Sequence, residues 1–282
     1  MTDPVIFEEI PERAALGSVA DIYSDIRRVL GVPMVAFVYR ALAAAPGRLE
    51  RVWEALAPNL ASVQAQCDAA SLDPPQHWQV AAVPQTALEV ARIDSVRLAR
   101  TLDGFDRANR LNVIGLHALL AGTPGDHTAD RGEAPSAELH EMLPMADLSS
   151  LDPDTITLLE RMSAPIAGAQ QPILIPSLFR YFAHDRHLLE TIARSMGPAI
   201  ENERFHNAVA AITARARAQS LRLPYAVPRA HDLRTREIIT RFTTTIPGMI
   251  VTTNLLRLAF RESPTRTTQG EDMSSSGLRS SY

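Results

Sequence analysis

Hydrophobic residues recur at intervals of three and four along most of the chain, which is the spacing that gives a helix one buried face. The first such stripe consists of Val19, Ile22, Ile26 and Leu30. The alternation typical of strands is almost absent, so we predict an all-α fold. The pattern predicts helices over about 17–30, 33–42, 48–67, 95–120, 154–162, 173–183, 186–195, 198–219 and 235–260.

Polar residues and prolines mark several expected helix ends. Asp94 is placed to cap the long helix that follows it, and Thr86 with Glu89 has the spacing of a capping box. Pro33 suits the first turn of a helix, where its missing N–H costs nothing. Pro58 lies inside an apolar stripe, so we expect it to kink or break that helix.

The segment 32–47 recurs in degraded form as 171–183. With a shift of 140 positions, Arg40 falls on Arg180, while a neighbouring proline is displaced by one position. We therefore predict two pseudo-symmetric helical repeats that form an intramolecular pseudo-dimer, with the site between them.

Composition supports boundaries around these repeats. A stretch rich in Gly, Pro, Thr and Asp separates the halves, and the end of the chain is rich in Ser and Thr without hydrophobic periodicity. We predict a first repeat at 1–120, a connector at 121–142, a second repeat at 143–262 and a disordered tail at 263–282.

Charge and residue usage exclude several classes of function. The formal net charge of −4 and the lack of a basic stripe argue against nucleic acid as a partner. The single cysteine, Cys67, allows no disulfide framework or cysteine-rich metal site. No export signal or membrane span is visible, so we expect a cytoplasmic protein. All 28 positive side chains are arginine, which excludes a lysine Schiff base or a Walker A lysine.

The expected helix at 101–120 carries the strongest candidates for chemistry. Asp106 and Asn109 fall one turn apart on the same face as Phe105 and Val113, so their polar groups need partners. Asn109 could hold a carboxylate or a water, and Asp106 could act as a buried base. The alternative is that both side chains cap neighbouring helix ends.

Two further clusters are weaker candidates. His184, Asp185 and His187 look suited to acid–base chemistry, but the repeat places them at an interhelical turn, and no zinc-type spacing accompanies them. We therefore predict no metal site. Thr243 belongs to a cluster of threonines that either lines a pocket or bonds back to carbonyls of its own helix.

The segments 32–37, 40–43 and 46–47, together with Phe105 and Asn109, resemble the group I 2-haloacid dehalogenases. These enzymes accept both enantiomers of a small halogenated acid. The resemblance covers roughly 11–260, includes 143–147, and is strongest in the first 60 residues. It implies an all-helical pseudo-dimer of two repeats, as the internal alignment also predicts.

In that family an aspartate of the second repeat activates a water that attacks the halogen-bearing carbon, and an asparagine of the first repeat helps to position the water. The resemblance places Asn109 at the asparagine, and Phe37 and Ser177 at positions of the substrate pocket. The aspartate position is occupied by Leu178, and a pocket tryptophan is replaced by Met34. Leucine cannot accept a proton, so the family mechanism cannot operate at Leu178.

Three hypotheses follow. The first is an enzyme on this scaffold with altered chemistry, a hydrolase, lyase or cyclase acting on a small or medium organic acid or a natural-product intermediate. The second is a 2-haloacid dehalogenase that uses Asp106 as its base, and the third is a non-catalytic protein that binds a small ligand. We expect no cofactor and a small-molecule substrate. Two fused repeats already form a pseudo-dimer and allow a monomer, whereas the resemblance favours a homodimer.

Overall fold

The computed structural model describes residues 7–75, 77–125, 145–168 and 172–261. This part of the chain holds eleven α-helices, two short 3-10 helices and no strand, which confirms the all-α prediction. None of the helices in these ranges is long and apolar enough to cross a membrane. The predicted tail at 263–282 and most of the predicted connector lie outside the described residues.

The helices follow the predicted order. The first six are α1 (Gly17–Leu30), α2 (Phe37–Ala43), α3 (Arg48–Leu60), α4 (Val63–Ala70), α5 (Gln85–Val90) and α6 (Ser95–Ala121). The remaining five are α7 (Pro153–Ala167), α8 (Ser177–Phe182), α9 (Arg186–Ile200), α10 (Glu203–Ser220) and α11 (Leu233–Ala259).

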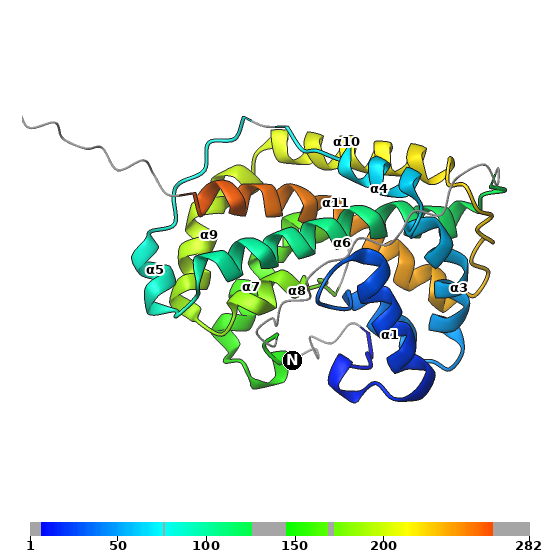
Figure 1. Cartoon of the computed structure of the whole chain (residues 1–282). Helices are drawn as coiled ribbons and strands as arrows, with labels where there is room; N and C mark the ends of the chain where they lie inside the picture. Colours follow the sequence, from blue (N-terminus) through cyan, green and yellow to red (C-terminus); the bar gives the residue numbers. More distant parts are fainter. Residues whose placement is uncertain (1–6, 76, 126–144, 169–171, 262–282) are drawn as a thin grey trace, which may run out of the picture.

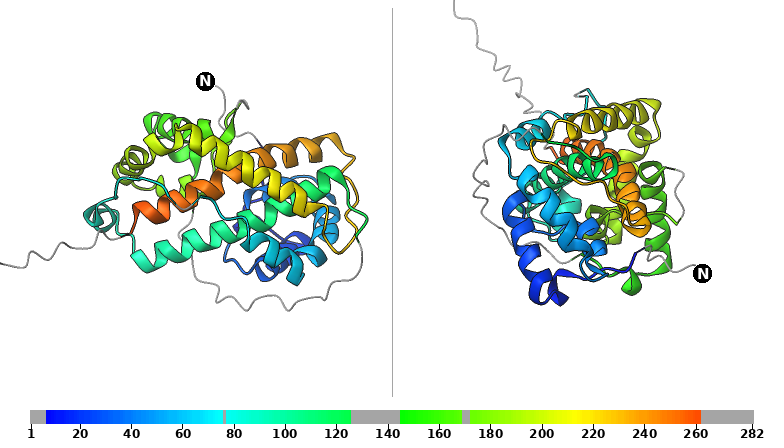
Figure 2. Two further views of the ribbon diagram at one scale, coloured as in Figure 1. Left: turned by 90° about the horizontal axis from the view of Figure 1, so that it is seen from above. Right: turned by 90° about the vertical axis from the view of Figure 1, so that its right-hand side faces the viewer.

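Two helices of 27 residues each, α6 and α11, pack side by side through the centre of the molecule (Figure 1). The six consecutive residues from Leu111 to Leu116 are all buried, so this part of α6 has no solvent-facing side. Figures 1 and 2 show α1 and α3 toward one end of this central pair and α7 and α9 toward the other. Helix α10 packs on both central helices.

The helix ends confirm some predictions and correct others. The Asp94 carboxylate accepts a hydrogen bond from the Arg97 backbone N–H at 2.7 Å and caps α6 as predicted. The capping box at Thr86 was wrong, because α5 begins one residue earlier, at Gln85, without a side-chain cap. Pro58 is accommodated in α3, which ends two residues later, at Leu60.

The predicted helix start at Pro33 was also wrong. Helix α2 begins at Phe37, and residues 32–36 form a non-helical entry segment. In the second half, α8 begins at Ser177 rather than near residue 173, again after a non-helical segment. Both entry segments therefore present consecutive side chains to the interior instead of turning them around a helix axis.

Corresponding contacts are made to Arg40 of α2 and to Arg180 of α8. The Ile10 N–H donates to the Arg40 carbonyl oxygen at 3.1 Å, and the Ala146 N–H donates to the Arg180 carbonyl oxygen at 3.2 Å. The Glu9 carboxylate contacts both guanidinium groups, at 2.8 Å for Arg40 and 3.5 Å for Arg180. These matched contacts are what the internal repeat predicts, while the two-fold relation of the halves stays a prediction.

Candidate functional site

A small cavity lies where the entry segments of α2 and α8 meet α6 and α11. Its volume is about 50 Å³, which fits a ligand of a few heavy atoms rather than a polymer. Most of the lining is apolar. Its polar side chains are those of Asn109, Asn112, Ser177 and Thr245.

The lining takes side chains from both halves of the chain in a regular way. Each of the positions 34, 36, 37, 38, 105 and 109 lines the cavity, and so does the position 140 residues later. The same shift relates Arg40 to Arg180 in the sequence. The correspondence is therefore what two facing repeats would produce, although the paired residues differ in chemistry.

Five candidates chosen from the sequence line this cavity together: Met34, Phe37, Asn109, Ser177 and Leu178. The entry segments and short helices α2 and α8 supply four of them, and α6 supplies Asn109. The structure thus brings residues far apart in the chain into one wall. Their roles in binding or chemistry stay predictions.

The Phe37 side of the cavity is backed by a buried arginine. The Arg40 guanidinium lies over the Phe37 ring, 5.5 Å from its centroid, and forms an ion pair with Glu9. Burial lowers the pKa of Arg40, and the neighbouring Glu9 carboxylate counteracts that effect. The arginine thus contacts the back of an aromatic residue of the wall and is not itself part of the lining.

Thr243 is absent from this lining, which corrects its choice as a pocket residue. Its hydroxyl donates to the Thr240 carbonyl oxygen at 3.0 Å within α11. Thr245, two residues further on, lines the cavity, and its hydroxyl likewise donates to the Arg241 carbonyl oxygen. Back-bonding of this kind satisfies the hydroxyl groups without a ligand.

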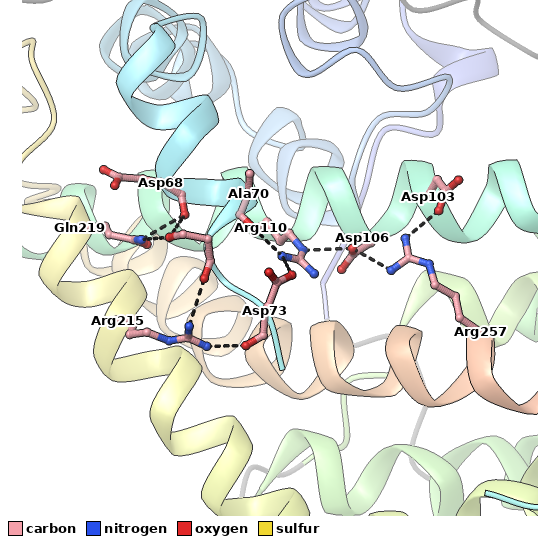
Figure 3. Close-up of polar contacts among 10 residues, drawn as sticks. Asp68, Ala70, Asp73, Asp103, Asp106, Arg110, Arg215, Gln219 and Arg257 are labelled. Atoms are coloured by element: carbon pink, nitrogen blue, oxygen red, sulfur yellow. Dashed lines mark hydrogen bonds and ion pairs between the residues drawn. The ribbon is translucent and has the colours of Figure 1, made fainter. Parts of the chain in front are cut away.

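Asp106 lies on a different face of α6 from Asn109, and the two do not meet in the cavity. Three residues advance a helix by about 300°, so side chains one turn apart still diverge by about 60°. The Asp106 carboxylate pairs with Arg110 and with Arg257 of α11, both at 3.0 Å (Figure 3). It belongs to a second, polar cavity together with Arg107.

The sequence reading missed Asn112, which lines the cavity three residues beyond Asn109. Asn112 is fully buried, and its Oδ1 accepts a hydrogen bond of 2.8 Å from the Tyr39 hydroxyl. Its Nδ2 has no hydrogen-bond partner among the described residues. The helical period from Phe105 through Asn109 would have pointed to this position, because residues at i, i+4 and i+7 share a face.

The charged clusters elsewhere have structural explanations. Asp185 caps α9 by accepting a hydrogen bond from the Leu188 N–H at 2.8 Å, as expected for a residue at an interhelical turn. Within the described ranges no group of three or more His, Cys, Asp or Glu side chains is arranged to hold a metal ion.

Burial lowers the pKa of His117 to about 4, with a smaller contribution from Arg217.

Comparison with known proteins agrees with this architecture. No family model matches the chain. A configuration-inverting 2-haloacid dehalogenase of Alcaligenes xylosoxydans xylosoxydans is 24% identical over 259 residues, which span 88% of this chain and 79% of the relative. Among solved structures, a D-2-haloacid dehalogenase mutant in complex with D-2-CPA superposes with a TM-score of 0.73 at 18% identity, covering 92% of this chain and 98% of the other.

The fold is that of the D-2-haloacid dehalogenases. A second structure, of D-2-haloacid dehalogenase with L-LA, gives a TM-score of 0.72 at 17% identity over 90% of this chain and 96% of that one. The similarity in sequence and structure supports a haloacid-dehalogenase-like enzyme scaffold. At these identities the solved structures establish the dehalogenase fold, and the cavity residues must be assessed for chemistry on their own.

Proposed function

We propose that the protein is an enzyme of the dehalogenase fold whose chemistry is not the attack of a carboxylate-activated water. Its substrate is a small organic acid or natural-product intermediate that enters the cavity between α2, α8, α6 and α11. The proposal rests on similarity to dehalogenases over 88% of the chain together with an altered cavity wall.

One observation carries this proposal. Leu178, at the position where the resemblance expects the catalytic aspartate, is 1% exposed and lines the cavity. The lining residues within the described ranges include no Asp, Glu, His, Cys, Lys or Arg. Displacement of a halide by water forms a carbon–oxygen bond, releases the halide and leaves a proton that a base must accept. The lining supplies no such base.

Asp106 is a poor substitute for that base on geometric grounds. Its carboxylate is held between two guanidinium groups at 3.0 Å, outside the cavity that Asn109 lines. The dehalogenase alternative requires a carboxylate beside a water near Asn109. A reaction that depends on holding the substrate in a reactive shape, with one or two polar anchors, fits this wall better.

The second candidate is a protein that binds a small ligand without turning it over. The lack of a titratable side chain in the described lining is the observation in its favour. The two candidates share the cavity and differ in whether the bound ligand is converted. Recovery of an unchanged ligand from prolonged incubation would favour the second candidate.

The decisive experiment measures halide release and binding for both enantiomers of 2-chloropropionate. The variants are Leu178→Asp, which restores a carboxylate, and Leu178→Asn, which has a similar shape and cannot act as a base. We expect no halide release by the wild type and by Leu178→Asn. Release by Leu178→Asp alone would support loss of the base in an otherwise preserved site.

Three other outcomes are also informative. Halide release by the wild type would contradict the proposal and return attention to Asp106. If none of the three proteins releases halide and the wild type still binds 2-chloropropionate, this would support a cavity that serves other chemistry. Absence of binding to the wild type would contradict a site for small organic acids. Circular dichroism verifies that each variant is folded.

A further inference from the structure

Asn112, which lines the cavity, carries a hydrogen-bond donor that the fold leaves unused. The Nδ2 of Asn112 is buried and has no partner among the described residues, whereas Oδ1 of the same amide is held by Tyr39. A buried amide group without a partner costs free energy, so such a group in a cavity wall requires an explanation. A ligand that carries an acceptor oxygen would provide the missing partner.

The side chains behind Asn112 restrain its amide. Burial raises the pKa of the Tyr39 hydroxyl well above its usual value, so this group stays protonated and able to donate. The Tyr39 ring packs edge-on against Trp53, with centroids 5.5 Å apart. The Trp53 Nε1–H in turn donates to Asp25 at 2.8 Å. This series of contacts restrains the tyrosine, whose hydroxyl donates to Oδ1 of Asn112, and Nδ2 is then the end of the amide without a partner among the described residues.

The second half of the chain does not supply an equivalent pair. At the shift of 140 positions, Tyr39 corresponds to Phe179, which has no hydroxyl group, and Asn112 corresponds to Thr252, which is outside the cavity lining. Both asparagines of the lining come from α6, whereas α11 contributes Phe242, Ile246 and Met249 together with one hydroxyl residue, Thr245. The Thr245 hydroxyl is already bonded within α11, so the amide groups that a ligand could reach come from one helix and would orient it.

We propose that Tyr39 is a positioning residue, which holds the Asn112 amide so that its N–H groups recognise an acceptor oxygen of the ligand. The ligand class is a small molecule with a carboxylate or carbonyl oxygen at one end and an apolar group at the other. This inference rests on the proposed function, because it takes the cavity to be the ligand site. It adds the residue that determines which kind of polar group is accepted.

Three probes of matched shape test the inference. The probes are 2-chloropropionate, 2-chloropropionamide and 2-chloro-3-methylbutane, in which an isopropyl group replaces the carboxylate. Binding is followed through the fluorescence of Trp53 in a Trp78→Phe background, since the sequence has two tryptophans. The first two probes also distinguish a carboxylate from a neutral carbonyl as the preferred acceptor.

We expect Tyr39→Phe to weaken binding of the acceptor-bearing probes by about tenfold, which corresponds to the free energy of one hydrogen bond. The affinity for 2-chloro-3-methylbutane, which has no acceptor oxygen, should change by less than about twofold. The control is Tyr23→Phe. Tyr23 is equally buried, and its hydroxyl donates to the Ile10 carbonyl oxygen at 2.8 Å, away from the cavity lining. This control should leave the affinity for every probe unchanged.

A double variant guards against failure to fold. Tyr39→Phe with Asn112→Leu replaces both hydrogen-bonding partners by apolar groups of similar shape, which is better tolerated than removing one partner. This double variant should lose the preference for acceptor-bearing probes and still bind 2-chloro-3-methylbutane. Equal weakening of all probes by Tyr39→Phe would reduce the tyrosine to a structural role and overturn the inference, as would no effect on any probe.

The wild type separates the two proposals. If the wild type binds 2-chloro-3-methylbutane as tightly as the acceptor-bearing probes, the inference fails while the cavity remains a ligand site. If it binds none of the probes, the proposed function fails and the inference fails with it. Preference for an acceptor-bearing probe, abolished by Tyr39→Phe, supports both.

Discussion

Two faces on nearly opposite sides of α6 differ in chemistry. One face lines the small cavity with side chains at positions 105, 108, 109 and 112. The other lines the polar cavity with side chains at positions 103, 106, 107 and 110. Both sets have the spacing of a single helical stripe, and they are offset by two residues.

The partners of each face explain the difference. The polar face meets Arg257 of α11 and, through Arg110, the carboxylate of Asp73 (Figure 3). The cavity face meets the apolar entry segments of α2 and α8. Charge is thus used to join helices on one side, while the other side is left with neutral polar groups for a ligand.

Asp106→Asn should destabilise the protein without affecting the cavity. Removing this charge leaves Arg110 and the partly buried Arg257 with one carboxylate partner each, Asp73 and Asp103, so we expect a cost of about 3 kcal/mol, the low end for breaking a buried pair. Urea unfolding measures the change. The control Asp103→Asn removes a carboxylate that is 68% exposed and should cost under about 1 kcal/mol. Loss of ligand conversion at unchanged stability would instead make Asp106 a base.

Stability should fall in acid through His117, two turns beyond Arg110 on α6. Its pKa is lowered to about 4 in the folded protein, mainly by burial, from an ordinary value of 6.5. The unfolded chain therefore takes up a proton first, and stability present above pH 6.5 is lost as the pH falls toward 4.

The full shift corresponds to about 3 kcal/mol, and the partial exposure of His117 reduces the expected loss to about 2 kcal/mol. The variant His117→Gln should remove this part of the pH dependence. Unfolding curves between pH 4 and 7 measure it. Binding of a neutral probe should not follow the same titration, because the described cavity lining has no titratable group. A probe affinity that titrates together with stability would contradict the separation of the two faces.

Ala108→Leu should block the cavity at a small cost in stability. Ala108 is buried in the cavity wall, and a larger side chain there would occupy space that a ligand needs. Strain from the added atoms should cost about 1 kcal/mol, the low end for overpacking, because the cavity receives part of the volume. Titration with 2-chloropropionamide should show at least a tenfold loss of affinity. Unchanged affinity would place the ligand elsewhere.

Thr245→Val should have the smallest effect. The Thr245 hydroxyl already donates to the Arg241 carbonyl oxygen within α11, so removing it deprives the ligand of nothing. We expect a stability change under about 0.5 kcal/mol, as for other back-bonded threonines, and probe affinity within twofold. Thr243→Val is the matched control outside the lining. A large loss of affinity in Thr245→Val alone would assign its hydroxyl to the ligand.

Local sequence signals determined the secondary structure well where the cause was local. Helical periodicity was sufficient to predict the all-α fold, and an aspartate before the apolar stripe was sufficient to locate the start of α6 at Ser95. The non-helical entry segments at 32–36 and before α8 were misjudged, because Pro33 is compatible with both states. Tertiary packing selected the non-helical one.

The family resemblance selected five residues that the structure places in the cavity lining, including Asn109 and Leu178. The shift of 140 positions relates several other lining positions in pairs. Such positions are recoverable because a repeated or related backbone places equivalent residues in equivalent walls. What each side chain does there was not recoverable in the same way.

Tertiary structure decided the direction of the polar side chains. Asp106 and Asn109 differ by about 60° around one helix, and only the positions of Arg257 and of the entry segments assign them to different cavities. The pairing of Tyr39 with Asn112 joins residues 73 positions apart. A hydrogen bond depends on the distance and angle between two groups, and for groups this far apart in the chain only the packed helices set both.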